Sequence, residues 1–127
     1  MQEDLEYAVL HEFVGPAKRN VSRGTWDYLM GGAETETTYI RNRRALDELA
    51  FRPRVLRNVE HVDTSAKVLG CKLDLPVILA PIGSLQDMVA AGGVAPSRAA
   101  AAFGAIHMLS SQSAPGLEAV AASNEHP

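Results

Sequence analysis

The chain has 127 residues, a length that suffices for one ordinary domain. Its formal net charge of −3 argues against a polyanion, such as nucleic acid or an acidic membrane surface, as a partner. The single cysteine, Cys71, excludes an internal disulfide framework, and the acidic start MQEDLEY lacks the apolar core of a signal peptide. We therefore expect a cytoplasmic protein, with no transmembrane segment because the longest uncharged run, 99–117, is broken by polar residues and a proline.

Three helices are predicted in the first half. Apolar residues at i, i+4 and i+8 (Leu5, Val9, Phe13) predict an amphipathic helix over 4–13, which Gly15-Pro16 would end.

The second helix is expected to begin after an N-cap at Ser22 and to run to Met30, before Gly31-Gly32. The third is expected over 35–50, with acidic residues in its first turn and Pro53 beyond its end.

The second half predicts alternating strands and helices. A hairpin is expected over 65–75 with Gly70 at its turn, and an apolar strand over 77–80. A helix over 92–103, ended by Gly104, leads to a second strand over 105–109 and a helix over 115–122 with Ser113 as a plausible N-cap. The order βαβα with short connections predicts a parallel sheet with right-handed crossovers.

Charge is distributed unevenly. Residues 1–75 carry 23 charged side chains, whereas residues 76–127 carry only four. A segment that is apolar on nearly every face normally lies deep inside a larger structure. We therefore expect residues 76–127 to need more covering structure than this chain supplies.

Four segments in order carry a family resemblance. They are YLMGGAETETT at 28–38, FRPRVL at 51–56, VLGCKLDLPVILAP at 68–81 and HMLSSQS at 107–113. Together they resemble the FMN-dependent α-hydroxy acid oxidase and dehydrogenase family, which includes glycolate oxidase, lactate oxidase and the mandelate dehydrogenases.

The resemblance implies an α/β fold, namely the N-terminal portion of a TIM (β/α)8 barrel. Residues 1–62 would form a helical N-terminal cap, 63–75 a β-hairpin at the barrel base, and 76–127 the first two βα units of an incomplete FMN-binding barrel. It also implies FMN as cofactor and a small 2-hydroxy acid as substrate, oxidised to a 2-oxo acid, in complete members that form homo-oligomers.

The resemblance assigns candidate binding residues. Tyr28 would hold the substrate carboxylate, because a phenol donates a hydrogen bond without adding a second charge. Gln112 would lie on the substrate side of the site.

Four further residues would contact the flavin after the two strands: Pro81, Ile82, Gly83 and Ser110. Both groups follow carboxyl ends of strands, the rim where barrel enzymes carry out chemistry. We expect no metal site.

The resemblance places the catalytic histidine and the substrate-binding arginines on later strands. We therefore expect no catalytic residue in this chain, and little activity or FMN binding by the chain alone. The family's His-Pro-acidic-Gly-Glu run is replaced by Val89-Ala90-Ala91-Gly92-Gly93, which leaves the identity of the 2-hydroxy acid open.

Two alternatives stay open. The chain could be a truncated product without flavin, or a non-catalytic oligomerising fragment in which four copies of two strands close a barrel. An arginine-rich nucleic-acid binder is disfavoured, because Asp47 and Glu48 interrupt the basic cluster and no aromatic platform accompanies it. The cluster consists of Arg41, Arg43, Arg44, Arg52, Arg54 and Arg57.

Overall fold

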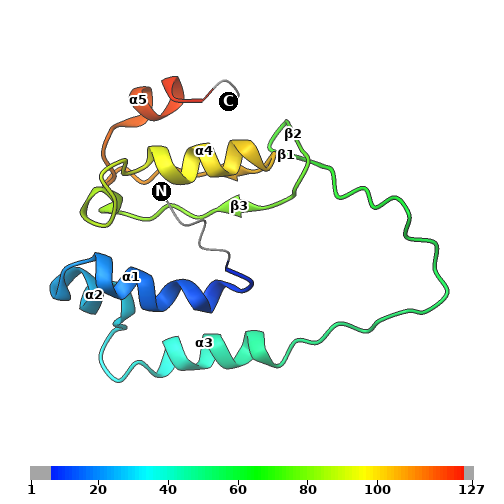
Figure 1. Cartoon of the computed structure of the whole chain (residues 1–127), viewed down its shortest axis with the longest axis horizontal. Coiled ribbons are helices and arrows are strands. Elements are labelled where there is room, and N and C mark those ends of the chain that lie inside the picture. Colours follow the sequence, from blue (N-terminus) through cyan, green and yellow to red (C-terminus); the bar gives the residue numbers. More distant parts are fainter. Residues whose placement is uncertain (1–6, 125–127) are drawn as a thin grey trace. The chain divides into compact units, whose positions relative to one another are not determined.

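The computed structural model describes residues 7–124 (Figure 1). The chain divides into two compact units, one up to Leu56 and one from Arg57 onward. The first unit is helical, and the second contains all the strands of the described residues.

The first unit begins with a 3-10 turn, η1 (Leu10–Phe13), that runs into α1 (Val14–Asn20). The predicted helix end at Gly15-Pro16 is therefore wrong, because both residues lie in the first turn of α1. Proline is tolerated there since the N–H it lacks would have no intrahelical acceptor. The start of the predicted 4–13 helix, including Leu5, lies outside the described residues.

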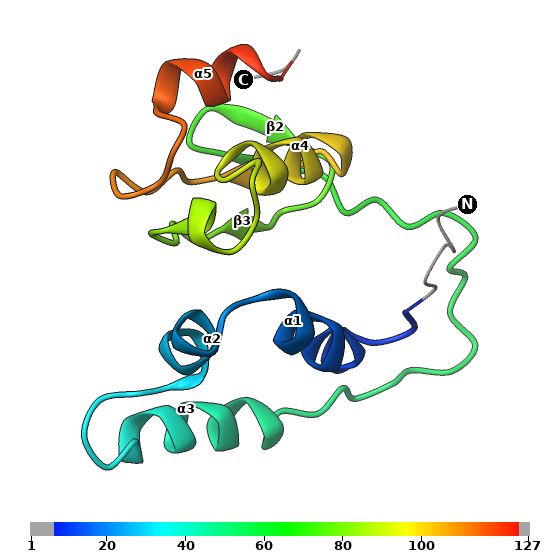
Figure 2. The same cartoon turned by 60° about the vertical axis from the view of Figure 1, so that its left-hand side comes forward.

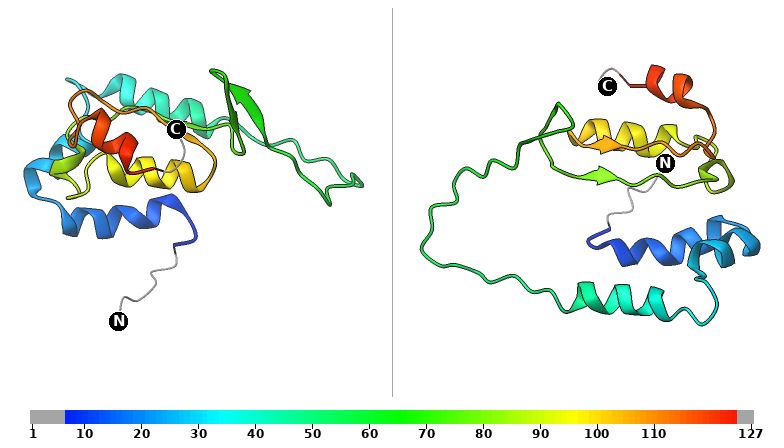
Figure 3. Two further views of the ribbon diagram at one scale, coloured as in Figure 1. Left: turned by 90° about the horizontal axis from the view of Figure 1, so that it is seen from above. Right: turned by 180° about the vertical axis from the view of Figure 1, so that it is seen from behind.

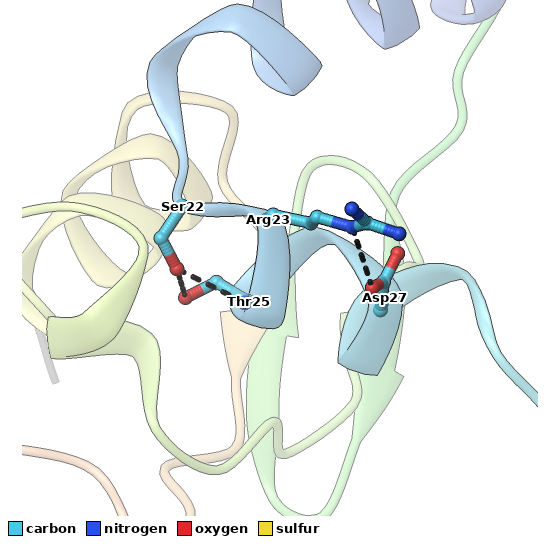
Figure 4. Close-up of polar contacts among 4 residues, drawn as sticks. All are labelled: Ser22, Arg23, Thr25 and Asp27. Atoms are coloured by element: carbon cyan, nitrogen blue, oxygen red, sulfur yellow. Dashed lines mark hydrogen bonds and ion pairs between the residues drawn. The ribbon is translucent and has the colours of Figure 1, made fainter.

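Helix α2 (Arg23–Met30) has the two ends that were predicted. The Oγ of Ser22 accepts a hydrogen bond from the N–H of Thr25 at 3.1 Å and lies 2.9 Å from the Thr25 hydroxyl (Figure 4). Arg23 and Asp27, one turn apart, form an exposed ion pair at 3.7 Å. The N-cap thus satisfies a donor that would otherwise be left without a partner, and Gly31 ends the helix.

Helix α3 (Thr37–Asp47) is shorter than the predicted 35–50. Glu34 and Glu36 have positive φ values of 49° and 58°, so they lie before the helix. The expectation of acidic residues in its first turn is therefore wrong. The Glu36 carboxylate instead accepts from the N–H of Gly32 at 2.9 Å, which stabilises the turn that leads into α3.

The second unit opens with an antiparallel hairpin. Strand β1 (Ala66–Val68) pairs with β2 (Cys71–Leu73), and Gly70 lies at the turn, as predicted. Leu69 and Gly70 both have positive φ values, 52° and 85°, a combination typical of tight hairpin turns.

Strands β3 (Ile78–Leu79) and β4 (Ile106–His107) pair in parallel, which confirms the predicted arrangement. Ile78 lies opposite Ile106, and the two arrows point the same way in Figure 3, right. Helix α4 (Val94–Ala102) connects the strands and runs alongside them in Figures 1 and 2. It ends at a turn in which Gly104 has a φ of 60°.

The loops after the two strands differ in detail from the prediction. A 3-10 turn, η2 (Leu85–Asp87), follows β3. Helix α5 (Leu117–Ala122) has Gly116 as its N-cap, so the expectation that Ser113 caps it is wrong. Ser113 instead closes a turn in which its N–H donates to the carbonyl of Ser110 at 3.1 Å, and its side chain is buried toward Gly93.

The core of the second unit is small. Leu73, Ala100 and Val120 are each 4% exposed. By contrast, Ile78 and Leu79 of β3 are 37% and 36% exposed, although the sequence pattern predicts a strand buried on both faces. The difference arises because β3 and β4 pair only with each other among the described residues, which leaves their outer edges uncovered.

No helix among residues 7–124 combines the length and apolar character that crossing a bilayer requires.

Candidate active-site loops

Two loops follow the carboxyl ends of the parallel strands. We call residues 80–93, after β3, the first loop, and residues 108–116, after β4, the second loop. Since parallel strands end at the same edge of a sheet, the two loops meet at one end of the second unit (Figure 1).

Three of the predicted site residues come together where these loops meet. A Cβ built on Gly83 would lie 3.2 Å from the Cβ of Gln112 and 3.8 Å from the Oγ of Ser110. The N–H of Gln112 donates to that Oγ at 3.2 Å. Glycine at position 83 therefore allows the second loop to approach the backbone of the first closely at this point.

Two hydrogen-bond donors at this cluster are available to a ligand. Within residues 7–124, the N–H of Gly83 has no hydrogen-bond acceptor. The Ser110 oxygen accepts from Gln112, which leaves the hydroxyl proton free to donate. An amide without an acceptor and a hydroxyl fit the edge of a ring that carries carbonyl oxygens and acceptor nitrogens, as a flavin does.

Pro81 and Ile82 connect β3 to this cluster. Both side chains are exposed, Ile82 to 52%, and Pro81 has no N–H to donate. Contact with the flavin remains a prediction for both residues.

Tyr28 belongs to the first unit. It lies in the last turn of α2, and its side chain is 69% exposed. Substrate binding by its hydroxyl remains a prediction, and Tyr28 is not part of the cluster in the second unit.

His107 is the last residue of β4 and lies opposite Leu79 of β3. Its Nδ1 is buried without a hydrogen-bond partner. Burial disfavours the charged imidazolium and lowers the pKa of this histidine below its usual value of 6.5. This shift favours a neutral imidazole at His107.

Sequence reasoning missed Gln86. Its Oε1 accepts a hydrogen bond from the N–H of Ala114 at 2.9 Å, across 28 residues. A single glutamine in an irregular loop carries no periodic signal, so only the pairing of the strands reveals this contact. No three His, Cys, Asp or Glu side chains gather as a metal site in the part of the chain that the structure describes.

Comparison with known proteins decides the family. The model of the family described as "FMN-dependent dehydrogenase" matches residues 17–127. The chain belongs to this family. Its members use FMN, so the donors of Gly83 and Ser110 lie in a chain of the appropriate class.

Curated relatives include two plant enzymes. The chain is 40% identical over 111 residues to glycolate oxidase 1 of Oryza sativa subsp. indica, covering 87% of this chain and 30% of that relative. It is 34% identical over 117 residues to glycolate oxidase of Spinacia oleracea, covering 92% and 32%. The chain thus spans about a third of the length of these relatives.

Among solved structures, the chain resembles mandelate oxidase with a TM-score of 0.88 and 30% sequence identity, covering 96% of this chain and 36% of that chain. The FMN-dependent dehydrogenase chain described here is therefore a partial region of the TIM-barrel fold of these oxidases.

Proposed function

We propose that the chain is the N-terminal portion of an FMN-dependent enzyme that oxidises a 2-hydroxy acid to a 2-oxo acid. The observation that carries the proposal is the cluster of Gly83, Ser110 and Gln112 at the ends of two parallel strands in a member of this family. The names of the relatives, glycolate oxidase and mandelate oxidase, support a 2-hydroxy acid as the substrate class.

In this proposal the bound flavin supplies an acceptor for two electrons. The N–H of Gly83 and the hydroxyl of Ser110 donate hydrogen bonds that orient its ring. The missing side chain at Gly83 lets Gln112 and Ser110 lie close to that amide. Pro81 and Ile82 line the same edge of the ring.

Two residues of the chain bind the substrate. In this proposal the phenol of Tyr28 donates to the carboxylate, and the amide of Gln112, whose Cβ lies close to Gly83, faces the substrate. We assign no base to this chain. The family resemblance places two groups of residues on later strands: the histidine that removes the proton and the arginines that neutralise the carboxylate. The chain alone is therefore expected to be inactive and to hold little FMN.

A chimera tests the proposal. This chain replaces the aligned segment of rice glycolate oxidase 1, and the purified protein is assayed for bound FMN and for oxidation of glycolate, lactate and mandelate. We expect a yellow protein that oxidises at least one of these acids. A folded chimera without flavin, or one with flavin but no activity on 2-hydroxy acids, would contradict the proposal.

A matched pair of serine variants sharpens the test. Loss of one neutral hydrogen bond weakens an interaction by roughly 0.5–1.5 kcal/mol, so Ser110→Ala should raise the Kd for FMN by about 2-fold to 10-fold. Ser111→Ala removes the neighbouring hydroxyl, which is exposed, and should leave the Kd unchanged. Equal Kd values for the two variants would remove Ser110 from the flavin site.

The non-catalytic alternative is tested on the 127-residue chain itself. It requires a stable, monodisperse tetramer by light scattering, with no bound flavin. We also propose a cytoplasmic location, on the basis of the single, unpaired Cys71, and cell fractionation tests it.

A further inference from the structure

The backbone N–H and carbonyl of Ala114 join the two candidate active-site loops. Its N–H donates to the Oε1 of Gln86 at 2.9 Å, and its carbonyl accepts from the N–H of Gly93 at 3.0 Å. Both partners belong to the first loop, whereas Ala114 lies in the second. Both backbone polar groups of one residue of the second loop are therefore bonded to the first loop.

A third hydrogen bond lies on the other side of the cluster. The N–H of Ser84 donates to the carbonyl of Gln112 at 3.1 Å. Gln112 is therefore fixed at its own carbonyl and again two residues later, at Ala114. These bonds flank the close approach of Gln112 to Gly83.

The first loop has room for the Ala114 carbonyl because Gly92 lacks a side chain. A Cβ on Gly92 would overlap that oxygen, and Gly92 has a φ of 52°. The Ala114 carbonyl thus packs against glycine backbone, and Gln86 binds the N–H of the same residue.

We infer that Gln86 is a positioning residue that holds the second loop so that Gln112 lies against Gly83. The other two inter-loop bonds join backbone to backbone, whereas this one depends on a side chain. The inference rests on the proposed function, because Gly83 and Gln112 are the residues assigned to the flavin and the substrate. Gln86 contacts neither ligand in this account and acts through Ala114.

Nuclear magnetic resonance on the 127-residue chain tests the inference without any ligand. Three variants are compared with the natural chain: Gln86→Leu removes the acceptor, Gln86→Glu keeps one, and Asp87→Asn changes the exposed neighbour in η2 as a control. The measured quantities are hydrogen exchange of the Ala114 amide and the nuclear Overhauser effect between the Gly83 Hα and Gln112 Hβ protons.

We expect a protected Ala114 amide and a visible Gly83–Gln112 nuclear Overhauser effect in three proteins: the natural chain, the Gln86→Glu variant and the Asp87→Asn variant. In Gln86→Leu the exchange rate of that amide should rise about tenfold, which corresponds to the loss of one net hydrogen bond. The Gly83–Gln112 nuclear Overhauser effect should weaken in the same variant. The Met108 amide, which donates to Leu79 in the strand pair, should exchange at an unchanged rate in every variant.

A pH titration provides a signature that loss of stability would not produce. In Gln86→Glu the chemical shift of the Ala114 amide proton should titrate with the introduced carboxyl group, at or below its usual pKa of about 4.3. The inference is overturned if that shift does not titrate, if Gln86→Leu matches the natural chain, or if the natural chain shows no Gly83–Gln112 effect. Since no flavin is involved, these failures are distinct from failure of the chimera.

Discussion

Gly92 lies directly against the carbonyl of Ala114, so closely that a Cβ on Gly92 would overlap the oxygen. This contact joins the two candidate active-site loops across more than 20 residues of chain. The absence of a side chain at one position of the first loop therefore decides whether the second loop can pack against it.

Gly92→Ala should destabilise the second unit by two effects. An alanine at a φ of 52° costs roughly 1–2 kcal/mol, and overpacking against backbone costs roughly 1–3 kcal/mol more. Gly70→Ala is the matched control, because Gly70 has a φ of 85° but nothing within 4 Å of its would-be Cβ. Urea unfolding, monitored by circular dichroism, should show a larger decrease in the free energy of unfolding for Gly92→Ala than for Gly70→Ala. Equal decreases in the two variants would contradict the overlap.

Ser22→Ala should weaken α2. The hydrogen bond from the Thr25 N–H to the Ser22 oxygen would be lost, at a cost of roughly 1 kcal/mol in helix stability. Hydrogen exchange of the Thr25 amide should accelerate about fivefold to tenfold, whereas Ser22→Asp, which retains an acceptor, should preserve protection. An unchanged exchange rate in Ser22→Ala would mean that the cap contributes nothing.

The free energy of unfolding should fall as the pH is lowered through the His107 titration. Because burial lowers the pKa of His107 in the folded chain, the unfolded chain takes up a proton first, near pH 6.5. Stability from the neutral imidazole is therefore present above pH 6.5 and is progressively lost toward the lower folded pKa.

Denaturant unfolding at pH 7.5, 6.5 and 5.5 measures this dependence. His107→Met removes the titrating group and the unpartnered Nδ1, so the loss of stability with falling pH should become smaller. His11→Gln, a change at an exposed position, serves as the control. If His107→Met and the natural chain lose the same stability between pH 7.5 and pH 5.5, His107 does not contribute to the dependence.

Tyr28→Phe tests the proposed carboxylate contact in the glycolate oxidase chimera. A hydrogen bond to a charged group is worth roughly 1.5–3 kcal/mol, so kcat/KM for the 2-hydroxy acid should fall about 10-fold to 100-fold. Tyr39→Phe removes another exposed phenol, on α3, and should leave kcat/KM unchanged. An unaltered kcat/KM in Tyr28→Phe would exclude this role, provided the chimera binds FMN.

Features that depend on near neighbours in the chain were predictable from the sequence. The cap at Ser22, the hairpin turn at Gly70 and the end of α4 at Gly104 each follow from the conformational preference of one residue. The parallel pairing of β3 and β4 followed from their order around a helix. Since both strands then end at one edge, the meeting of Gly83 with Ser110 was predictable as well.

Features that depend on distant partners were decided by the tertiary structure. Serine is a common N-cap residue, yet Ser113 is buried beside Gly93 because the second loop packs onto the first. The bond from Ala114 to Gln86 spans 28 residues and exists only once the strands are paired. Local preferences, worth about 1 kcal/mol each, specify turns and caps, whereas contacts between loops follow from which backbone groups the paired strands bring within hydrogen-bond reach.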